Sequence, residues 1–236
     1  MELSSARILI TGGGTGIGLA IARRLRAADS RVAICGRRQN VLDEAATVLG
    51  ATPLVGDVSQ PDDAERIVSE AIVALGGLDV LINNAAIGYF APLLETDTER
   101  MRQVLDVNVI GATLMAQACS RHFIAQGNGG TIVNIGSTAS HKGFAGGGAY
   151  AASKFALAAL SQCWRAELRQ HDIRVMQVNP SEVQTNFGGR DGSQLPINET
   201  KLVSDDVAHL VEHLITLADR SFVTDITLWA TNPQSG

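Results

Sequence analysis

The stretch Ile8-Leu9-Ile10-Thr11-Gly12-Gly13-Gly14-Thr15-Gly16-Ile17-Gly18-Leu19-Ala20 decides the fold of this chain. It joins an apolar run to a glycine-rich turn and then to the start of a helical pattern. Glycine lets an anion approach a helix N-terminus, where unpaired N–H groups and the helix dipole attract negative charge. A purely structural turn is the alternative, but the strand-turn-helix setting favours a site for a dinucleotide pyrophosphate. The expected contacts are Gly12, Gly14, Thr15, Gly16, Ile17 and Gly18.

Short apolar runs alternate with helical periodicity along the rest of the chain. Strands are expected at residues 7–11, 31–35, 52–56, 79–82, 131–135, 174–179 and 225–229. Helices are expected near residues 17–28, 38–49, 61–75, 97–126, 149–170 and 204–218. Strands separated by crossover helices pair in parallel. The expected fold class is therefore α/β: a single doubly wound Rossmann-type domain, residues 1–236, with a seven-stranded parallel sheet and helices on both faces.

Residues 187–201 follow neither period and contain Gly188, Gly189, Gly192 and Pro196. Loops of this length in compact domains often cover active sites, so this segment is a candidate substrate lid. Surface disorder is the alternative interpretation.

Composition narrows the class of protein. The 236 residues include 45% hydrophobic residues and 24 glycines, which suits an α/β domain with many tight turns. A net charge of −5 argues against a nucleic-acid surface. No apolar run approaches the length of a membrane span and the N-terminus has no signal pattern, so we expect a cytoplasmic protein without membrane contact.

No metal is predicted. The three cysteines, Cys35, Cys119 and Cys163, lie far apart without the spacing of metal ligands or of a disulfide framework. His209 and His213 share one face of an expected helix, but no motif supplies a third ligand, and an amphipathic helix explains them.

The end of the second strand selects between nicotinamide cofactors. It reads Cys35-Gly36-Arg37-Arg38, with no carboxylate before Asp43. A carboxylate would bind the ribose 2′-hydroxyl, whereas a 2′-phosphate needs cations. NADP(H) is therefore favoured over NAD(H), with Arg37 on the 2′-phosphate and Arg38 stacked on adenine.

Tyr150 and Lys154 lie four residues apart, on one face of an expected helix, and Ser137 lies upstream at the end of an apolar run. A tyrosine that exchanges protons near neutral pH needs a pKa below its usual value of about 10, which a nearby cation supplies. One exposed ion pair is too weak, so a desolvated site and a second positive charge are required. The alternative is a half-buried core tyrosine beside a solvated lysine.

Taken together, several motifs in series resemble the short-chain dehydrogenase/reductase family over nearly the whole chain. Within that family the chain looks most like the β-ketoacyl-acyl-carrier-protein reductase type. The motifs are the glycine-rich turn, Asp57-Val58, Asn83-Asn84-Ala85-Ala86-Ile87-Gly88, Asn108, Ser137, Tyr150-x-x-x-Lys154 and Asn179-Pro180-Ser181-x-Val183-x-Thr185.

The resemblance implies a catalytic role for four residues. Tyr150 would be the general acid in ketone reduction and the base in the reverse direction. Lys154 would bind the nicotinamide ribose and lower the pKa of Tyr150, helped by the oxidised nicotinamide ring. Ser137 would orient and polarise the substrate carbonyl, and Asn108 would hold a water that links Lys154 to solvent.

The resemblance also assigns cofactor contacts: Asp57 and Val58 to adenine, Asn84, Ala85 and Ala86 along the cofactor, and Pro180, Val183 and Thr185 beside the nicotinamide. Two positions depart from the family pattern, because Ala86 and Ser181 stand where glycine is usual. The C-terminal region also lacks the Asp-Gly-Gly ending that helps to build tetramers in related enzymes. We expect a homodimer or homotetramer.

The substrate is expected to meet Ser137, Tyr150, His141, Phe144 and Phe187, with Tyr89 and Phe90 nearby. These side chains suggest an open, mainly apolar site for a small-molecule carbonyl or acyl-thioester substrate. Basic residues that could receive a carrier protein near the lid are Lys142, Arg190 and Lys201.

The expected activity is NADPH-dependent reduction of a ketone to a secondary alcohol. The alternatives are oxidation of a secondary alcohol with NADP, a non-catalytic NADP sensor, and an epimerase or dehydratase with tightly held NAD. The complete set of Ser137, Tyr150 and Lys154 argues against a sensor, because a sensor needs no proton donor. Arg37 in place of an acid argues against the NAD enzymes.

Overall fold

Seven parallel strands form one sheet in the order β3-β2-β1-β4-β5-β6-β7 in the computed structural model, which describes residues 1–185, 187 and 198–231. This confirms the predicted Rossmann-type sheet. The strands are β1 (Arg7–Thr11), β2 (Arg31–Gly36), β3 (Thr52–Val55), β4 (Val80–Asn83), β5 (Gly130–Ile135), β6 (Ile173–Pro180) and β7 (Asp225–Leu228).

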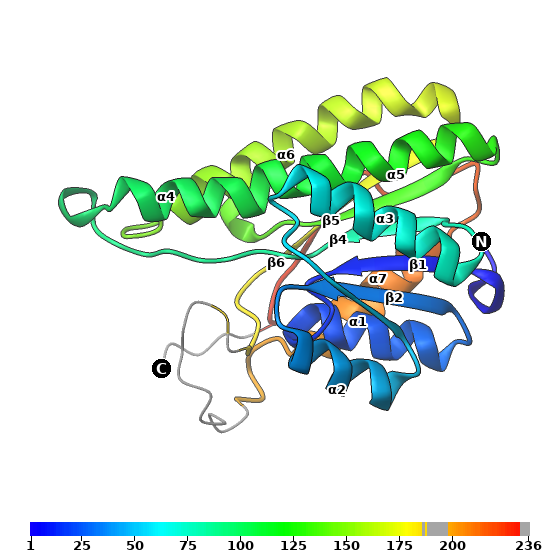
Figure 1. Cartoon of the computed structure of the whole chain (residues 1–236). Helices are drawn as coiled ribbons and strands as arrows, with labels where there is room; N and C mark the ends of the chain where they lie inside the picture. Colours follow the sequence, from blue (N-terminus) through cyan, green and yellow to red (C-terminus); the bar gives the residue numbers. More distant parts are fainter. Residues whose placement is uncertain (186, 188–197, 232–236) are drawn as a thin grey trace.

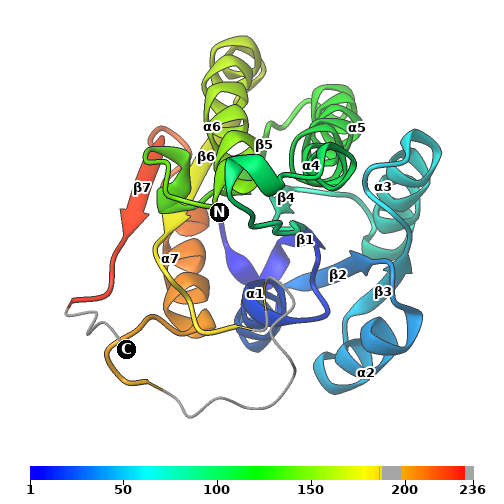
Figure 2. The same cartoon turned by 90° about the vertical axis from the view of Figure 1, so that its left-hand side faces the viewer.

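Helices cover both faces of the sheet, as Figures 1 and 2 show. One face packs against α1 (Gly16–Ala27), α2 (Gln39–Leu49) and α7 (Ser204–Thr216). The other packs against α3 (Pro61–Leu75), α5 (Ala112–Gln126) and the C-terminal part of α6 (Gly148–Leu168), with α4 (Thr98–Leu105) beyond. Short 3-10 turns are η1 (Leu3–Ser5), η2 (Leu93–Glu95), η4 (Thr138–Ser140) and η5 (Arg169–His171).

The central strands are buried on both faces, which explains their continuous apolar runs. A paired side chain fixes β1 beside β4: the Arg7 guanidinium donates to both oxygens of Asp79, at 2.8 and 2.6 Å. Among the described residues, none of the helices combines the length and apolar content that crossing a bilayer requires.

The strand order changes direction between β1 and β4. Strands β2 and β3 extend from one side of β1, and β4 to β7 extend from the other. In open α/β sheets the crevice at this point, beyond the carboxyl ends of the strands, is where ligands bind. The residues that follow β1, β4, β5 and β6 therefore meet at one edge.

The expected helix over residues 97–126 is interrupted. Between α4 and α5 the chain widens into a π-helix, η3 (Asp106–Gly111), which contains Asn108. A Cβ on Gly111 would lie 2.8 Å from Cγ2 of Val58, so this turn packs directly on the loop after β3. Helical periodicity did not reveal the π-helix.

Candidate active site

The turn after β1 is shaped for an anion. Gly12 and Gly16 have φ of 65° and 54°, a left-handed conformation that favours glycine. In the first turn of α1, a Cβ on Gly18 would lie 2.4 Å from the carbonyl oxygen of Gly12. Thr15 precedes α1 and its side chain makes no capping hydrogen bond, and the first turn carries no acidic residue. The N–H groups at this helix end are thus left for an anionic ligand.

Thr11 ties this turn to the loop after β4. Its Oγ1 accepts hydrogen bonds from the N–H groups of Asn84 and Ala85, at 3.0 and 2.9 Å. The Asn84 amide donates in return to the carbonyl oxygens of Thr11 and Gly12, at 2.9 and 3.2 Å. The side chain of Asn84, expected along the cofactor, therefore braces the protein. The sequence signal for Thr11 was a polar residue at the end of a buried strand.

Arg37 and Asp57 meet across the ends of β2 and β3. Arg37 Nη1 lies 3.7 Å from Asp57 Oδ2, and the Arg37 side chain is 62% exposed. The other oxygen of Asp57 accepts from the N–H and hydroxyl of Ser59, at 3.0 and 2.7 Å. Arg38 is exposed just before α2, and Val58 is buried. The Arg37 to Asp57 ion pair was not foreseen from the sequence.

Tyr150 and Lys154 both lie on α6, as expected, and Ser137 lies at the start of η4 after β5. Ser137 lies close enough to Tyr150 to lower the pKa of its hydroxyl, and Ser137 Oγ accepts from the N–H of Ala139 at 3.1 Å. Lys154 is 3% exposed, and its Nζ donates to the carbonyl oxygen of Ile135 at 2.7 Å. The same Nζ lies 5.7 Å from the centre of the Tyr150 ring.

The surroundings of Tyr150 and Lys154 disfavour the charged form of each side chain. Burial raises the pKa of Tyr150 above its usual value, and Ser137 offsets this only in part. Burial also lowers the pKa of Lys154 to about 8. Because Lys154 donates to Ile135 and both side chains are desolvated, the lysine by itself does not produce an acidic tyrosine.

Asn108 and Ser153 connect the π-helix to α6. Asn108 Oδ1 accepts from the N–H of Ile87 at 2.8 Å, and its Nδ2 donates to Ile87 O and Ser153 Oγ, both at 3.0 Å. Ser153 Oγ donates to the carbonyl oxygen of Tyr150 at 2.7 Å. The Asn108 side chain is therefore engaged by protein groups, and Ser153 is a site residue that the sequence reasoning missed.

The expected substrate residues divide into two groups. Phe90, Phe144 and Phe187 gather beside Tyr150. His141 lies 3.6 Å from the Asp225 carboxylate, and Tyr89 is 7% exposed, with its hydroxyl bonded to Glu95 O and Asp97 N. Tyr89 thus supports the turn at η2 and does not line an open site.

Residues after β6 return toward the nucleotide turn. Pro180 is buried at the end of β6, Val183 pairs with Leu202, and the Thr185 side chain lies beside Gly16. Ser181 donates its N–H to Leu228 O at 2.8 Å, which ties this segment to β7. The predicted lid, 187–201, lies largely outside the described residues, as do Asn186 and Arg190.

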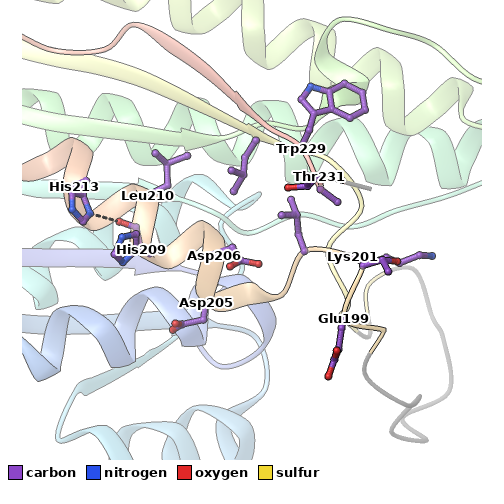
Figure 3. A pocket seen from close by; sticks show the side chains of 13 residues that line it. Glu199, Lys201, Asp205, Asp206, His209, Leu210, His213, Trp229 and Thr231 are labelled. Atoms are coloured by element: carbon purple, nitrogen blue, oxygen red, sulfur yellow. Dashed lines mark hydrogen bonds between the residues drawn. The ribbon is translucent and has the colours of Figure 1, made fainter. Parts of the chain in front are cut away.

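A hollow of about 950 Å³ lies between α7, residues 199–202 and the end of β7, and none of Ser137, Tyr150 and Lys154 lines it. Figure 3 shows His209 and His213 on α7, with Glu199, Lys201 and Trp229 across from them. His209, Glu212 and His213 hold three possible metal ligand atoms within 4.8 Å of one another. The Arg24 guanidinium contacts both His209 and Glu212, so a cation already lies there. The absence of a metal stays a prediction.

Comparison with known proteins identifies the family. Residues 6–195 match the model of the short chain dehydrogenase family. The chain is 33% identical to L-xylulose reductase of Homo sapiens, with 94% of this chain and 93% of that one covered. It is 34% identical to D-erythrulose reductase of Gallus gallus, with 95% and 93% covered.

A solved structure agrees with these relatives. A short chain dehydrogenase from Burkholderia cenocepacia J2315 in complex with NADP superposes with a TM-score of 0.84 at 32% identity, with 98% of each chain covered. The chain therefore belongs to the short chain dehydrogenase family. It is an oxidoreductase of CH–OH groups and their ketones, which confirms the predicted enzyme class.

Proposed function

We propose that this protein reduces a ketone to a secondary alcohol with NADPH and that Tyr150 donates the proton. The observation that carries the proposal is the placement of Ser137, Tyr150 and Lys154 together at the carboxyl edge of the sheet, beside the loop that Thr11 ties to the nucleotide turn. A proton donor and a carbonyl-orienting hydroxyl are what ketone reduction requires of a protein.

The cofactor proposed is NADP(H), and the residues present fit it. The left-handed glycines and the uncapped start of α1 suit a pyrophosphate, and the exposed guanidinium of Arg37 suits a 2′-phosphate. Asp57 holds Arg37 at the end of β2. When bound, NADPH supplies a hydride to the carbonyl carbon. A similar solved structure holds NADP.

The protein's own groups handle the carbonyl oxygen. Ser137 Oγ orients that oxygen, and the Tyr150 hydroxyl transfers its proton to it, leaving a phenolate. Burial keeps Tyr150 protonated at neutral pH but makes it a weaker acid, so proton transfer depends on stabilisation of the phenolate that forms. The Lys154 ammonium then stabilises the phenolate. The same phenolate would act as the base if the enzyme worked in the alternative direction, alcohol oxidation with NADP.

The other expected contacts complete the proposed cofactor site. The adenine would meet Asp57, Val58 and Arg38. Asn84, Ala85 and Ala86 would run along the cofactor, and Pro180, Val183 and Thr185 would flank the nicotinamide. We also propose a water near Asn108 that links Lys154 to solvent, so that Tyr150 can regain its proton. Because both Nδ2 hydrogens of Asn108 already have acceptors, this water would be held by the backbone of η3 or by Lys154.

The test is the variant Tyr150→Phe. NADPH oxidation with 2,3-butanedione should fall at least about a thousandfold, within the range expected when a general acid is lost. NADPH affinity, measured by fluorescence titration, should stay within about threefold of wild type. Turnover that survives in the variant contradicts the role of Tyr150. A wild-type protein that binds NADPH but reduces no carbonyl supports the sensor alternative.

A narrower proposal is that the substrate is a 3-oxoacyl thioester, as in β-ketoacyl-acyl-carrier-protein reductases. The same activity assay tests it with an acetoacetyl thioester. Of the basic residues suggested for a carrier protein, Lys201 lies 3.0 Å from Glu182 and is therefore already paired. Activity on the thioester but not on free ketones would support this subgroup. Activity on free ketones but not on the thioester would contradict this subgroup assignment.

A homodimer or homotetramer is proposed from exposed apolar surface. Leu93 and Leu94 of η2 are 88% and 98% exposed, which is costly in water unless a partner covers them. Light scattering of the purified protein should give at least twice the mass of one chain. A single-chain mass would contradict this proposal.

The cytoplasm is the proposed compartment. Cys35, Cys119 and Cys163 are all unpaired, as is usual where glutathione keeps thiols reduced. Cell fractionation with an antibody to the protein tests this, and recovery in a secreted or organellar fraction would contradict it.

A further inference from the structure

Two phenylalanine rings contact the ring of Tyr150, and a third packs against one of them. The centre of the Tyr150 ring lies 5.7 Å from that of Phe90 and 5.5 Å from that of Phe187. The Phe144 ring lies 6.2 Å from Phe90. These three residues, the phenylalanine cluster, come from separate segments that follow β4, β5 and β6.

The cluster is exposed where a core residue would be covered. Phe90, Phe144 and Phe187 are 46%, 51% and 38% exposed. Large apolar surface that gathers next to a reactive hydroxyl marks a surface that a ligand covers. The cluster therefore offers ring faces to a substrate whose carbonyl oxygen meets Tyr150.

Glycines leave room for these rings. A Cβ on Gly88 would lie 2.9 Å from the Phe90 ring and 3.0 Å from the Phe187 ring, and a Cβ on Gly147 would lie 2.4 Å from the Phe144 ring. Larger residues at either position would displace the rings. The backbone is thus shaped to accept aromatic side chains at this place.

Among the residues that the structure describes, the polar side chains named for the substrate site already have partners or a role in the proposed reaction. Ser137 is committed to the carbonyl oxygen in the proposed reaction, and His141 lies 3.6 Å from the Asp225 carboxylate. A ketose would lay several hydroxyl groups against ring faces that make weak hydrogen bonds, and those groups would lose their bonds to water. An aromatic group would instead pack on the rings in the tilted geometry that aromatic pairs prefer.

We propose that the substrate class is a ketone that carries an aromatic or similarly flat apolar group one or two carbons from the carbonyl, and that Phe90 and Phe144 select it. This rests on the proposed ketone reduction. It differs from the polyhydroxy ketones for which the two relatives are named.

Three ketones with one four-carbon chain test the proposal. 2-Butanone is the bare chain, 4-phenyl-2-butanone adds a ring, and erythrulose adds three hydroxyl groups. In wild type, kcat/KM for 4-phenyl-2-butanone should exceed that for 2-butanone at least tenfold, within the range that an apolar pocket provides. Erythrulose should show no comparable advantage over 2-butanone.

Variants then assign the selection to the rings. Phe90→Ala and Phe144→Ala should each lower the ratio of kcat/KM for 4-phenyl-2-butanone to that for 2-butanone about fivefold or more, within the range for altered apolar contact. Phe155→Ala is the matched control, because Phe155 is 45% exposed on α6 and outside the cluster, and its ratio should match wild type. Phe90→Leu and Phe144→Leu, which keep an apolar side chain without a ring, cover the case in which an alanine variant does not fold.

The two levels of the proposal fail differently. If 2,3-butanedione is reduced but 4-phenyl-2-butanone has no advantage, or the cluster variants leave the ratio unchanged, the substrate class is wrong and the reductase stands. An erythrulose preference has the same meaning. If neither 2,3-butanedione nor any of the three ketones is reduced while NADPH binds, the proposed function itself is wrong.

Discussion

At the residue scale, the chemistry of the site depends on the half-buried Tyr150 and the buried Lys154, whose charged forms are both costly. Tyr150 is held neutral by burial, and Lys154 has a pKa of about 8. Among the described residues, no second cationic side chain contacts Tyr150. In the proposed mechanism the oxidised nicotinamide ring therefore supplies the second positive charge. The tyrosine is then a stable acid before hydride transfer and a stabilised phenolate after it.

Lys154→Met should abolish turnover and stabilise the fold. Lowering a lysine pKa from 10.5 to about 8 corresponds to about 3 kcal/mol at neutral pH, partly offset by about 2 kcal/mol for the lost charged hydrogen bond to Ile135. Urea unfolding at pH 7 should therefore show a gain of about 1 kcal/mol.

The same variant gives a signed pH dependence. Below pH 8 the wild-type lysine is charged in both the folded and the unfolded chain, so the full burial cost is present. Between pH 8 and 10.5 the unfolded chain binds more protons, wild-type stability rises, and the gap to Lys154→Met closes. An equal gap at pH 7 and pH 10 would show that burial of charge is not the cause.

Arg37→Asp should shift cofactor preference toward NADH. The change removes a cation from the proposed 2′-phosphate site and adds repulsion, so the ratio of kcat/KM for NADPH to that for NADH should fall at least about thirtyfold. Arg23→Asp is the control, because Arg23 is 63% exposed and also faces an aspartate, Asp205. If the ratio of kcat/KM for NADPH to that for NADH is the same in both variants, Arg37 does not bind the 2′-phosphate.

At the element scale, the sequence predicted the helices and strands closely and missed what interrupts them. All seven strands were predicted within one residue at each end, because buried parallel strands are short apolar runs between glycines and helices. The π-helix η3 was not predicted, because one wider turn barely disturbs the apolar pattern on either side. Motif spacing located Tyr150 and Lys154, but only packing shows that Lys154 reaches Ile135 and that Ser153 links α6 to Asn108.

Gly18→Ala should disturb the start of α1. The new Cβ would lie 2.4 Å from Gly12 O and 2.5 Å from Asn84 Nδ2, so the turn must move, at a cost of about 1–3 kcal/mol. NADPH binding, by fluorescence, should weaken about tenfold or more, since each 1.4 kcal/mol is tenfold. Gly148→Ala is the control in the first turn of α6, where a Cβ meets nothing within 4 Å and helix propensity predicts a small gain in stability.

If the turn can move without cost, the Gly18→Ala variant will have the stability and the NADPH affinity of wild type. That outcome would mean that close packing of α1 on the loop after β4 is not what shapes the site.

At the scale of the whole molecule, Arg24 joins the helix that begins at the nucleotide turn to α7. Its guanidinium bonds Glu212 and lies 3.5 Å from Asp205. A double-mutant cycle with Arg24→Ala and Glu212→Ala should give a coupling energy of about 1 kcal/mol in urea unfolding, because both side chains are partly buried. Additive effects, within about 0.3 kcal/mol, would mean that the pair is only a surface contact.

The strand order β3-β2-β1-β4-β5-β6-β7 also has a meaning in time. As the chain leaves the ribosome, β2 joins β1, β3 joins β2, and β4 takes the free edge of β1. Each later strand then pairs with the one made just before it. No strand has to be inserted between two that are already paired, so the sheet can be assembled in the order of synthesis. Tyr150 on α6, the proposed proton donor, then arrives after the glycine-rich turn and the loop after β4 are in place.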